Sequence, residues 1–168
     1  MYYSGIIKCD SGNGPGFRVT LFVSGCRNRC PGCFNPETWD FRYGKEFTSE
    51  TMLEILRLLD NDNIDGLSIL GGDPFEPENR QAVEDICFMV KLLKPDKTIW
   101  CWTGYNWEDL KDLEIMRYID VLVDGPFMQE LKDLRLSYCG SSNQRVIDIQ
   151  ESNKRGCAIR YKGKEDWK

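Results

Sequence analysis

Alternation between two kinds of hydrophobic pattern constrains the fold of this 168-residue chain more than any other feature. Five short apolar runs are rich in β-branched and aromatic residues and are bounded by Gly, Pro, Asn or Asp, which is typical of strands. These runs lie at residues 18–23, 66–70, 97–102, 120–123 and 145–149. Between them, apolar residues recur at helical spacing over residues 47–63, 79–95 and 106–118. The first of these helical segments offers Thr48 or Ser49 as its N-cap.

Strands that alternate with helices predict an α/β fold. Such crossovers are right-handed, so they give a mainly parallel sheet with helices on at least one face. A complete eight-fold barrel takes about 250 residues, and this chain is much shorter. We therefore expect one domain over residues 1–168, built as a partial, open β/α barrel.

Glycine-rich or cysteine-rich motifs follow directly after four of the predicted strands. They are SGCRNRCPGC (24–33), GGDPF (71–75), TGYNW (103–107) and DGPF (124–127). Because the carboxyl ends of parallel strands share one edge, we expect the four motifs to meet at one site. In the second motif, Gly71 and Gly72 let a ligand approach the backbone, whose carbonyls can accept from an ammonium group, and Asp73 can add a charge-assisted pair.

Three of the eight cysteines, Cys26, Cys30 and Cys33, form a C-x3-C-x2-C pattern in a chain without histidine. Structural zinc is one interpretation, but a distant cysteine or a carboxylate would have to complete its tetrahedral site. A dithiol redox pair of Cys30 and Cys33 is another, and it leaves Cys26 unexplained. A third is a 4Fe-4S cluster, which would receive three thiolates and keep one iron open for a further ligand.

The cysteine pattern and the GGDP segment (71–74) together resemble the two motifs of the radical S-adenosylmethionine enzymes. The chain is more closely similar to one family among them, the anaerobic ribonucleotide reductase-activating proteins. This similarity covers nearly the whole chain and rests on NGPG (13–16), CPGCFNPETW (30–39), GGDPF (71–75), WTGY (102–105), DVLVDGPF (120–127) and GSSNQRVID (140–148). There are two departures: Gly32 stands where the wider superfamily often has an aromatic residue, and Cys139 stands where a basic residue is expected.

The resemblance implies a radical S-adenosylmethionine type of fold and a 4Fe-4S cluster ligated by Cys26, Cys30 and Cys33. The residues that it implies for S-adenosylmethionine binding are Gly32, Cys33, Phe34, Gly71, Gly72 and Asp73. Reductive cleavage of S-adenosylmethionine then yields a 5′-deoxyadenosyl radical, which takes a hydrogen atom from a glycine of anaerobic ribonucleoside-triphosphate reductase. The cofactor carries the radical, so no catalytic side chain is expected, and the lack of a histidine base agrees with this. A flavodoxin-like protein or another low-potential donor is implied as the electron source.

Charge and hydropathy exclude some other partners. A net charge of −5 lacks the positive field that nucleic acid binding needs, and no apolar run approaches the roughly 20 residues that span a bilayer. We therefore expect a cytoplasmic protein that binds neither nucleic acid nor membrane. Two alternatives stay open: activation of another glycyl-radical enzyme such as pyruvate formate-lyase, and a zinc-binding interaction module. For Asn143, Gln144 and Arg145, a solvated loop and contact with a ligand or partner are equally weighted.

Overall fold

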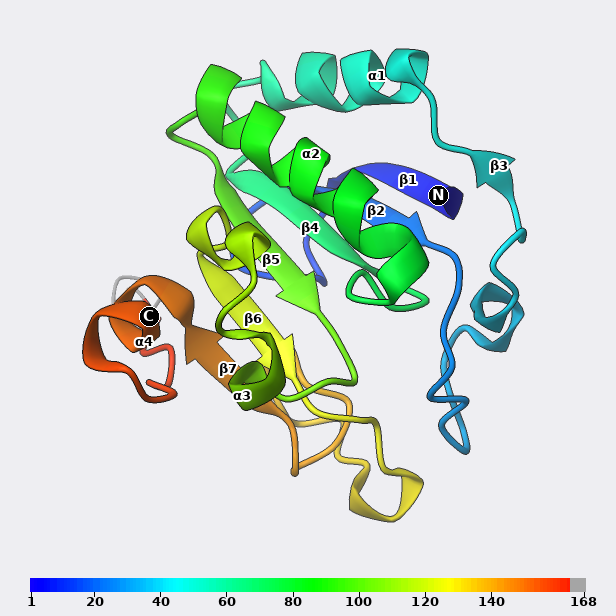
Figure 1. Ribbon diagram of the computed structural model, residues 1–168, viewed down its shortest axis with the longest axis vertical. Coiled ribbons are helices and arrows are strands. Elements are labelled where there is room, and N and C mark those ends of the chain that lie inside the picture. Colours follow the sequence, from blue (N-terminus) through cyan, green and yellow to red (C-terminus); the bar gives the residue numbers. More distant parts are fainter. Residues whose placement is uncertain (164–168) are drawn as a thin grey trace.

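The computed structural model describes residues 1–163 and contains a seven-stranded sheet in the order β3-β1-β2-β4-β5-β6-β7 (Figure 1). Its central strands are β2 (Arg18–Val23), β4 (Gly66–Gly71), β5 (Thr98–Trp102) and β6 (Val121–Asp124), and neighbours among them run parallel. The flanking strands are β1 (Tyr2–Asp10), β3 (Lys45–Glu46) and β7 (Arg145–Asp148), and they pair antiparallel. The fold is therefore mixed α/β, with a parallel centre.

The prediction of a mainly parallel sheet is thus correct for the centre and wrong for both sides. The sequence patterns do not predict β1, whose residues are mostly half-buried or exposed without a regular alternation. Residues 11–17 join β1 to β2, and a parallel pair needs a crossover of about a dozen residues or more, so this pair is antiparallel. Residues 125–144 join β6 to β7 through the short 3-10 helix η3 (Gln129–Leu131) in place of a crossover α-helix, and this pair is antiparallel too.

Two long helices, α1 (Ser49–Leu59) and α2 (Pro77–Leu93), cover one face of the sheet (Figure 1). Thr48 is the N-cap of α1, because its side chain accepts from the backbone N–H of Thr51. In the two segments where apolar residues recur at helical spacing, the buried ones that face the sheet include Ile55, Leu56, Leu59, Val83, Ile86 and Val90. Leu93, the last apolar residue at this spacing in α2, is instead 49% exposed, because α2 extends past the packed core at its last turn.

The remaining elements are short. They are the 3-10 helices η1 (Pro36–Trp39) and η2 (Glu114–Arg117) and the helices α3 (Trp107–Leu110) and α4 (Ile149–Arg155). The single helix expected over residues 106–118 is therefore divided into α3 and η2. The strand expected to reach Ile149 ends at Asp148, whose carboxylate accepts the Glu151 N–H at 3.0 Å and so begins α4. Among residues 1–163, no helix has both the length and the apolar character needed to cross a bilayer.

A buried arginine closes the other face of the central strands near their amino ends. Arg18 donates from Nε to the Ser68 hydroxyl at 2.7 Å, and from Nη2 to the carbonyls of Leu67 and Thr98, both at 2.9 Å. Its guanidinium also lies 5.7 Å from the centre of the Trp100 ring. Burial lowers the pKa of Arg18 to about 10, which leaves the group charged at neutral pH. The carboxyl end of this face stays free for a site.

Candidate functional site

A cavity of about 450 Å³ lies at the carboxyl ends of the central strands. Its lining combines the three cysteines of the first motif with residues of the other three motifs. These residues are Cys26, Cys30, Cys33, Phe34, Gly71, Gly72, Asp73, Thr103, Gly104, Gly125 and Phe127. The connection between β6 and β7 adds Leu134, Leu136, Tyr138, Cys139, Gly140 and Gln144. The structure therefore brings the four predicted motifs to one place.

The loop between β2 and η1 carries the three half-buried cysteines. The Cys33 N–H donates to the Cys30 carbonyl at 3.1 Å and closes a turn in which Gly32 has a φ of +72°, a conformation that glycine adopts readily. Gly32 shapes this turn and does not itself line the cavity. Burial raises the pKa of Cys26 to about 11 and also raises the pKa of Cys30. Because metal ligands are thiolates, metal binding here must release these protons.

The donor set of this loop fits a 4Fe-4S cluster. Each cysteine of such a cluster binds a different iron, so the three thiols need to border one space and need not converge on one point. Cys26, Cys30 and Cys33 all border the cavity. Within residues 1–163, no three His, Cys, Asp or Glu side chains are gathered as a site for a single metal ion.

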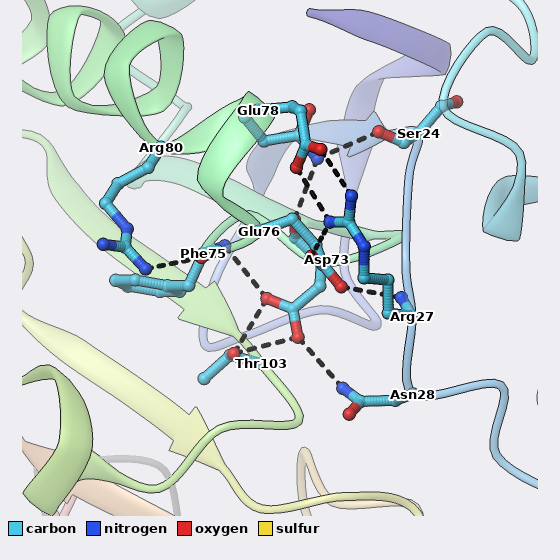
Figure 2. A network of polar contacts seen from close by, with 10 residues as sticks. Ser24, Arg27, Asn28, Asp73, Phe75, Glu76, Glu78, Arg80 and Thr103 are labelled. Carbon is cyan, nitrogen blue, oxygen red and sulfur yellow. Dashed lines mark hydrogen bonds and ion pairs between the residues drawn. The ribbon is translucent and has the colours of Figure 1, made fainter.

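The first turn of α2 holds the cysteine loop in place (Figure 2). The Glu76 side chain is 1% exposed, and its carboxylate accepts both the backbone N–H and the guanidinium of Arg27, each at 2.6 Å. The amide of the buried Asn79 donates to the carbonyls of Ser24 and Asp73, both at 2.9 Å. These contacts tie the start of the cysteine loop to α2.

Asp73 is 1% exposed, and both of its carboxylate oxygens accept from other parts of the chain (Figure 2). Oδ1 accepts the Thr103 hydroxyl at 2.8 Å and the Phe75 N–H at 2.9 Å. Oδ2 accepts the Gly104 N–H at 2.9 Å and the Asn28 amide at 3.4 Å. Burial raises the pKa of Asp73 to about 6, although these hydrogen bonds act in the opposite direction. The side chain therefore joins three loops that line the cavity.

Thr103→Val should lower the free energy of unfolding by about 2 kcal/mol. The substitution keeps the shape of the side chain and removes a hydroxyl donor from a buried carboxylate. Urea denaturation of the apoprotein measures the effect, with Ser137→Ala as a control because Ser137 carries an exposed hydroxyl. Equal stabilities of Thr103→Val and the unsubstituted protein would contradict the structural importance of this contact.

Gly71 and Gly72 lie where the end of β4 packs against the end of β2. Gly71 has a φ of +113°, and a Cβ placed on it would lie 2.6 Å from the Val23 carbonyl oxygen. A Cβ on Gly72 would lie 2.6 Å from the Gly25 carbonyl oxygen. Close approach between the two segments therefore requires glycine at both positions, independently of any ligand.

Aromatic side chains join the cysteine loop to the loop after β6. Phe34 lines the cavity and is 59% exposed, and its ring centre lies 5.3 Å from that of Phe127. The Lys132 ammonium lies 5.0 Å from the centre of the Phe34 ring. Leu134 also lines the cavity and is 80% exposed. The cavity therefore presents apolar side chains to solvent.

Comparisons with known proteins bear on this site. The sequence model of a family described as a 4Fe-4S single cluster domain matches residues 12–147. The anaerobic ribonucleoside-triphosphate reductase-activating protein of Enterobacteria phage T4 is 45% identical over 146 residues, which are 87% of this chain and 93% of that protein. Proteins of the same name from Vibrio cholerae serotype O1 and Escherichia coli K12 are 46% and 44% identical, over 87% and 89% of this chain and 97% and 100% of their own lengths.

This chain belongs to the family of anaerobic ribonucleoside-triphosphate reductase-activating proteins. The resemblance inferred from the motifs is confirmed, because relatives with this name are 44–46% identical over 87–89% of the chain. The family model, over residues 12–147, spans the NGPG and GSSNQR segments. In this member of the family, each segment on which the resemblance was based contributes residues to the lining of one cavity.

The GSSNQR loop of this family member (residues 140–145) forms part of one wall of the cavity. Gln144 donates to the Gly125 carbonyl at 3.0 Å and accepts the Gly140 N–H at 2.8 Å. The Asn143 amide donates to the Pro126 carbonyl at 2.8 Å. The loop is thus tied to the segment that follows β6, and Gln144 also faces the cavity.

Arg145, the last residue of the GSSNQR segment, forms ion pairs with two carboxylates outside the cavity lining. Its guanidinium pairs with the buried carboxylate of Asp124, with the closest approach at 2.5 Å, and with Glu108 at 2.7 Å. The pKa of Arg145 is raised because its side chain donates to both carboxylates. The arginine therefore joins the end of β6 to α3.

Four cysteines line the cavity, the three of the motif and Cys139, which is half-buried and packs beside Trp100 and Val123. The other four do not line it; Cys9 and Cys157 are exposed, whereas Cys87 and Cys101 are buried.

No sequence pattern predicted the roles of four side chains at this site, those of Arg27, Glu76, Asn79 and Thr103. Asn79 begins the predicted helix 79–95 and Glu76 lies three residues before it, where polar and acidic residues are ordinarily favourable. That local explanation hides their contacts with the cysteine loop.

Proposed function

We propose that this protein is a radical S-adenosylmethionine activase that installs a glycyl radical on anaerobic ribonucleoside-triphosphate reductase. The names of its relatives support the partner, and the family description supports the 4Fe-4S cluster. The observation that carries the proposal is that three thiols and the GGD backbone border one open cavity. The chain is one domain, and residues 1–163 form a partial barrel of the radical S-adenosylmethionine type, with α1 and α2 on its outer face and the cavity on its inner face.

Residue roles follow from the cavity. Cys26, Cys30 and Cys33 hold the cluster, and the backbone of residues 71–73 holds S-adenosylmethionine. Cys33 and Phe34 lie beside it, and Gly32 shapes the turn that carries them. When bound, these groups supply one-electron cleavage of the carbon–sulfur bond to methionine and a 5′-deoxyadenosyl radical, which becomes 5′-deoxyadenosine on taking a hydrogen atom from a glycine α-carbon. The Asp73 side chain contributes by joining the loops around the ligand.

Exposed apolar side chains at the cavity form a surface where the reductase can bind. Phe34 and Leu134 present apolar surface at the cavity, where a protein substrate can cover it and exclude water. A low-potential donor, such as a flavodoxin-like protein, supplies the electron.

Formation of a glycyl radical on the reductase tests this function. The reduced protein is incubated anaerobically with S-adenosylmethionine and the reductase from the same source, and electron paramagnetic resonance is recorded. A carbon-centred doublet should appear on the reductase, together with 5′-deoxyadenosine.

Replacement of the reductase's target glycine by alanine is the control and should remove the doublet. The same incubation with pyruvate formate-lyase examines the alternative partner. If a radical formed on pyruvate formate-lyase and none formed on the reductase, the proposed partner would be wrong, and the radical enzyme class would stand. Protein that bound zinc and no iron would favour an interaction module.

A further inference from the structure

A buried carboxylate contacts the cysteine loop between two of its cysteines. Glu76 Oε1 accepts the backbone N–H of Arg27 at 2.6 Å, and Arg27 directly follows Cys26 in the chain. The Glu76 side chain is almost completely shielded from solvent, whereas the Arg27 side chain is more than half exposed. The contact therefore holds the backbone of the loop from the protein side.

The charges around this contact do not cancel. The Arg27 guanidinium pairs with Glu76 at 2.6 Å and with the exposed Glu78 at 2.5 Å (Figure 2). It also lies 4.5 Å from the centre of the Phe41 ring. Two carboxylates share one guanidinium, so the group carries a net negative charge. Water screens Glu78 but not Glu76, and the buried charge therefore acts more strongly on its surroundings.

We propose that Glu76 is a positioning residue for the cluster: it orders the cysteine loop through the Arg27 backbone, and its buried negative charge lowers the reduction potential of the cluster. This inference rests on the proposed function, because it requires a cluster on Cys26, Cys30 and Cys33. A negative charge beside a cluster disfavours the added electron, and nearby charge and hydrogen bonding are known to set such potentials. Arg27 offsets part of this effect with its positive charge.

Two substitutions of Glu76 distinguish its effect on the order of the loop from its effect on the reduction potential. Glu76→Gln keeps an oxygen that can accept the Arg27 N–H and removes the charge. Its cluster should be retained, and its midpoint potential should shift in the positive direction. Glu76→Ala removes the acceptor as well, and it should lose iron to a chelator at least about tenfold faster than the unsubstituted protein.

Arg27→Gln gives the decisive comparison, because it leaves the backbone N–H in place and removes the positive charge. The midpoint potential should shift in the negative direction, opposite to that of Glu76→Gln, and Arg27→Lys should restore it. General loosening of the loop would move both potentials in the same direction. Glu114→Gln, in an exposed pair with Arg117, is the control and should cause no shift.

Midpoint potentials come from redox titration of the anaerobically reconstituted protein, followed by the electron paramagnetic resonance signal of the reduced cluster. Shifts of the same sign in Glu76→Gln and Arg27→Gln, or no shift in Glu76→Gln, would overturn the inference. Failure of the unsubstituted protein to hold a cluster would instead overturn the proposed function.

Discussion

Alanine at Cys26, Cys30 or Cys33 should abolish both the iron-sulfur absorption and the activation of the reductase. In the proposed cluster each thiolate holds one iron, and the described part of the cavity lining offers Cys139 as its one further cysteine. Cys139 lies on the β6–β7 connection and packs beside Trp100, whereas the three motif cysteines share one loop. A missing motif thiolate therefore leaves an iron without its protein ligand, and the cluster should not survive.

Visible absorption and iron per chain, measured after anaerobic reconstitution, give the result directly. Cys9→Ala and Cys157→Ala are matched controls, because both cysteines are exposed and neither lines the cavity. They should retain the cluster and the activity. A Cys30→Ala protein with a full cluster and normal turnover would show that the ligand assignment is wrong.

Gly72→Ala should weaken S-adenosylmethionine binding by at least about tenfold and lower the free energy of unfolding by about 1–3 kcal/mol. The added Cβ would lie 2.6 Å from the Gly25 carbonyl oxygen and 2.9 Å from its nitrogen, and both are backbone atoms. Because Gly25 directly precedes Cys26, the backbone that moves is continuous with the cysteine loop. The cluster content should therefore fall as well, although Gly72 has no side chain to bind iron.

Calorimetric titration with S-adenosylmethionine and urea denaturation measure the two effects, and iron analysis reports the cluster separately. Gly5→Ala is the control, because a Cβ at Gly5 would meet no atom within 4 Å. An unchanged dissociation constant in a Gly72→Ala protein that holds its cluster would show that the GGD backbone does not bind the ligand.

The fold was predictable where the pattern was local. The predicted strand 18–23 agrees with β2, and β4, β5 and β6 differ from their predicted ranges by at most one residue at either end, because burial on both faces produces continuous apolar runs. β1 escaped prediction because its half-exposed residues include Gly5 and Lys8 and lack an alternation. Its position depends on pairing with β2 on one side and β3 on the other.

The candidate site divides in the same way. Spacing along the chain was enough to single out Cys26, Cys30 and Cys33 as candidate cluster ligands and to place the four motifs at the ends of strands. It was not enough to show why Gly72 is a glycine, since the nearest atom to its missing side chain belongs to Gly25. The sequence also left the role of the GSSNQR loop open, and the structure adds that Asn143 and Gln144 donate to the carbonyls of residues 126 and 125.

The sequence by itself determined the cysteine pattern, the central strands and the edge of the sheet where the chemistry belongs, because each depends on residues close together in the chain. Only the tertiary structure decided the partners of the buried carboxylates of Glu76 and Asp73. Glu76 meets Arg27 across 49 positions, and Asp73 meets Thr103 across 30. Such pairs depend on which strands are neighbours and in what register, and a local hydrophobic pattern contains no information about either.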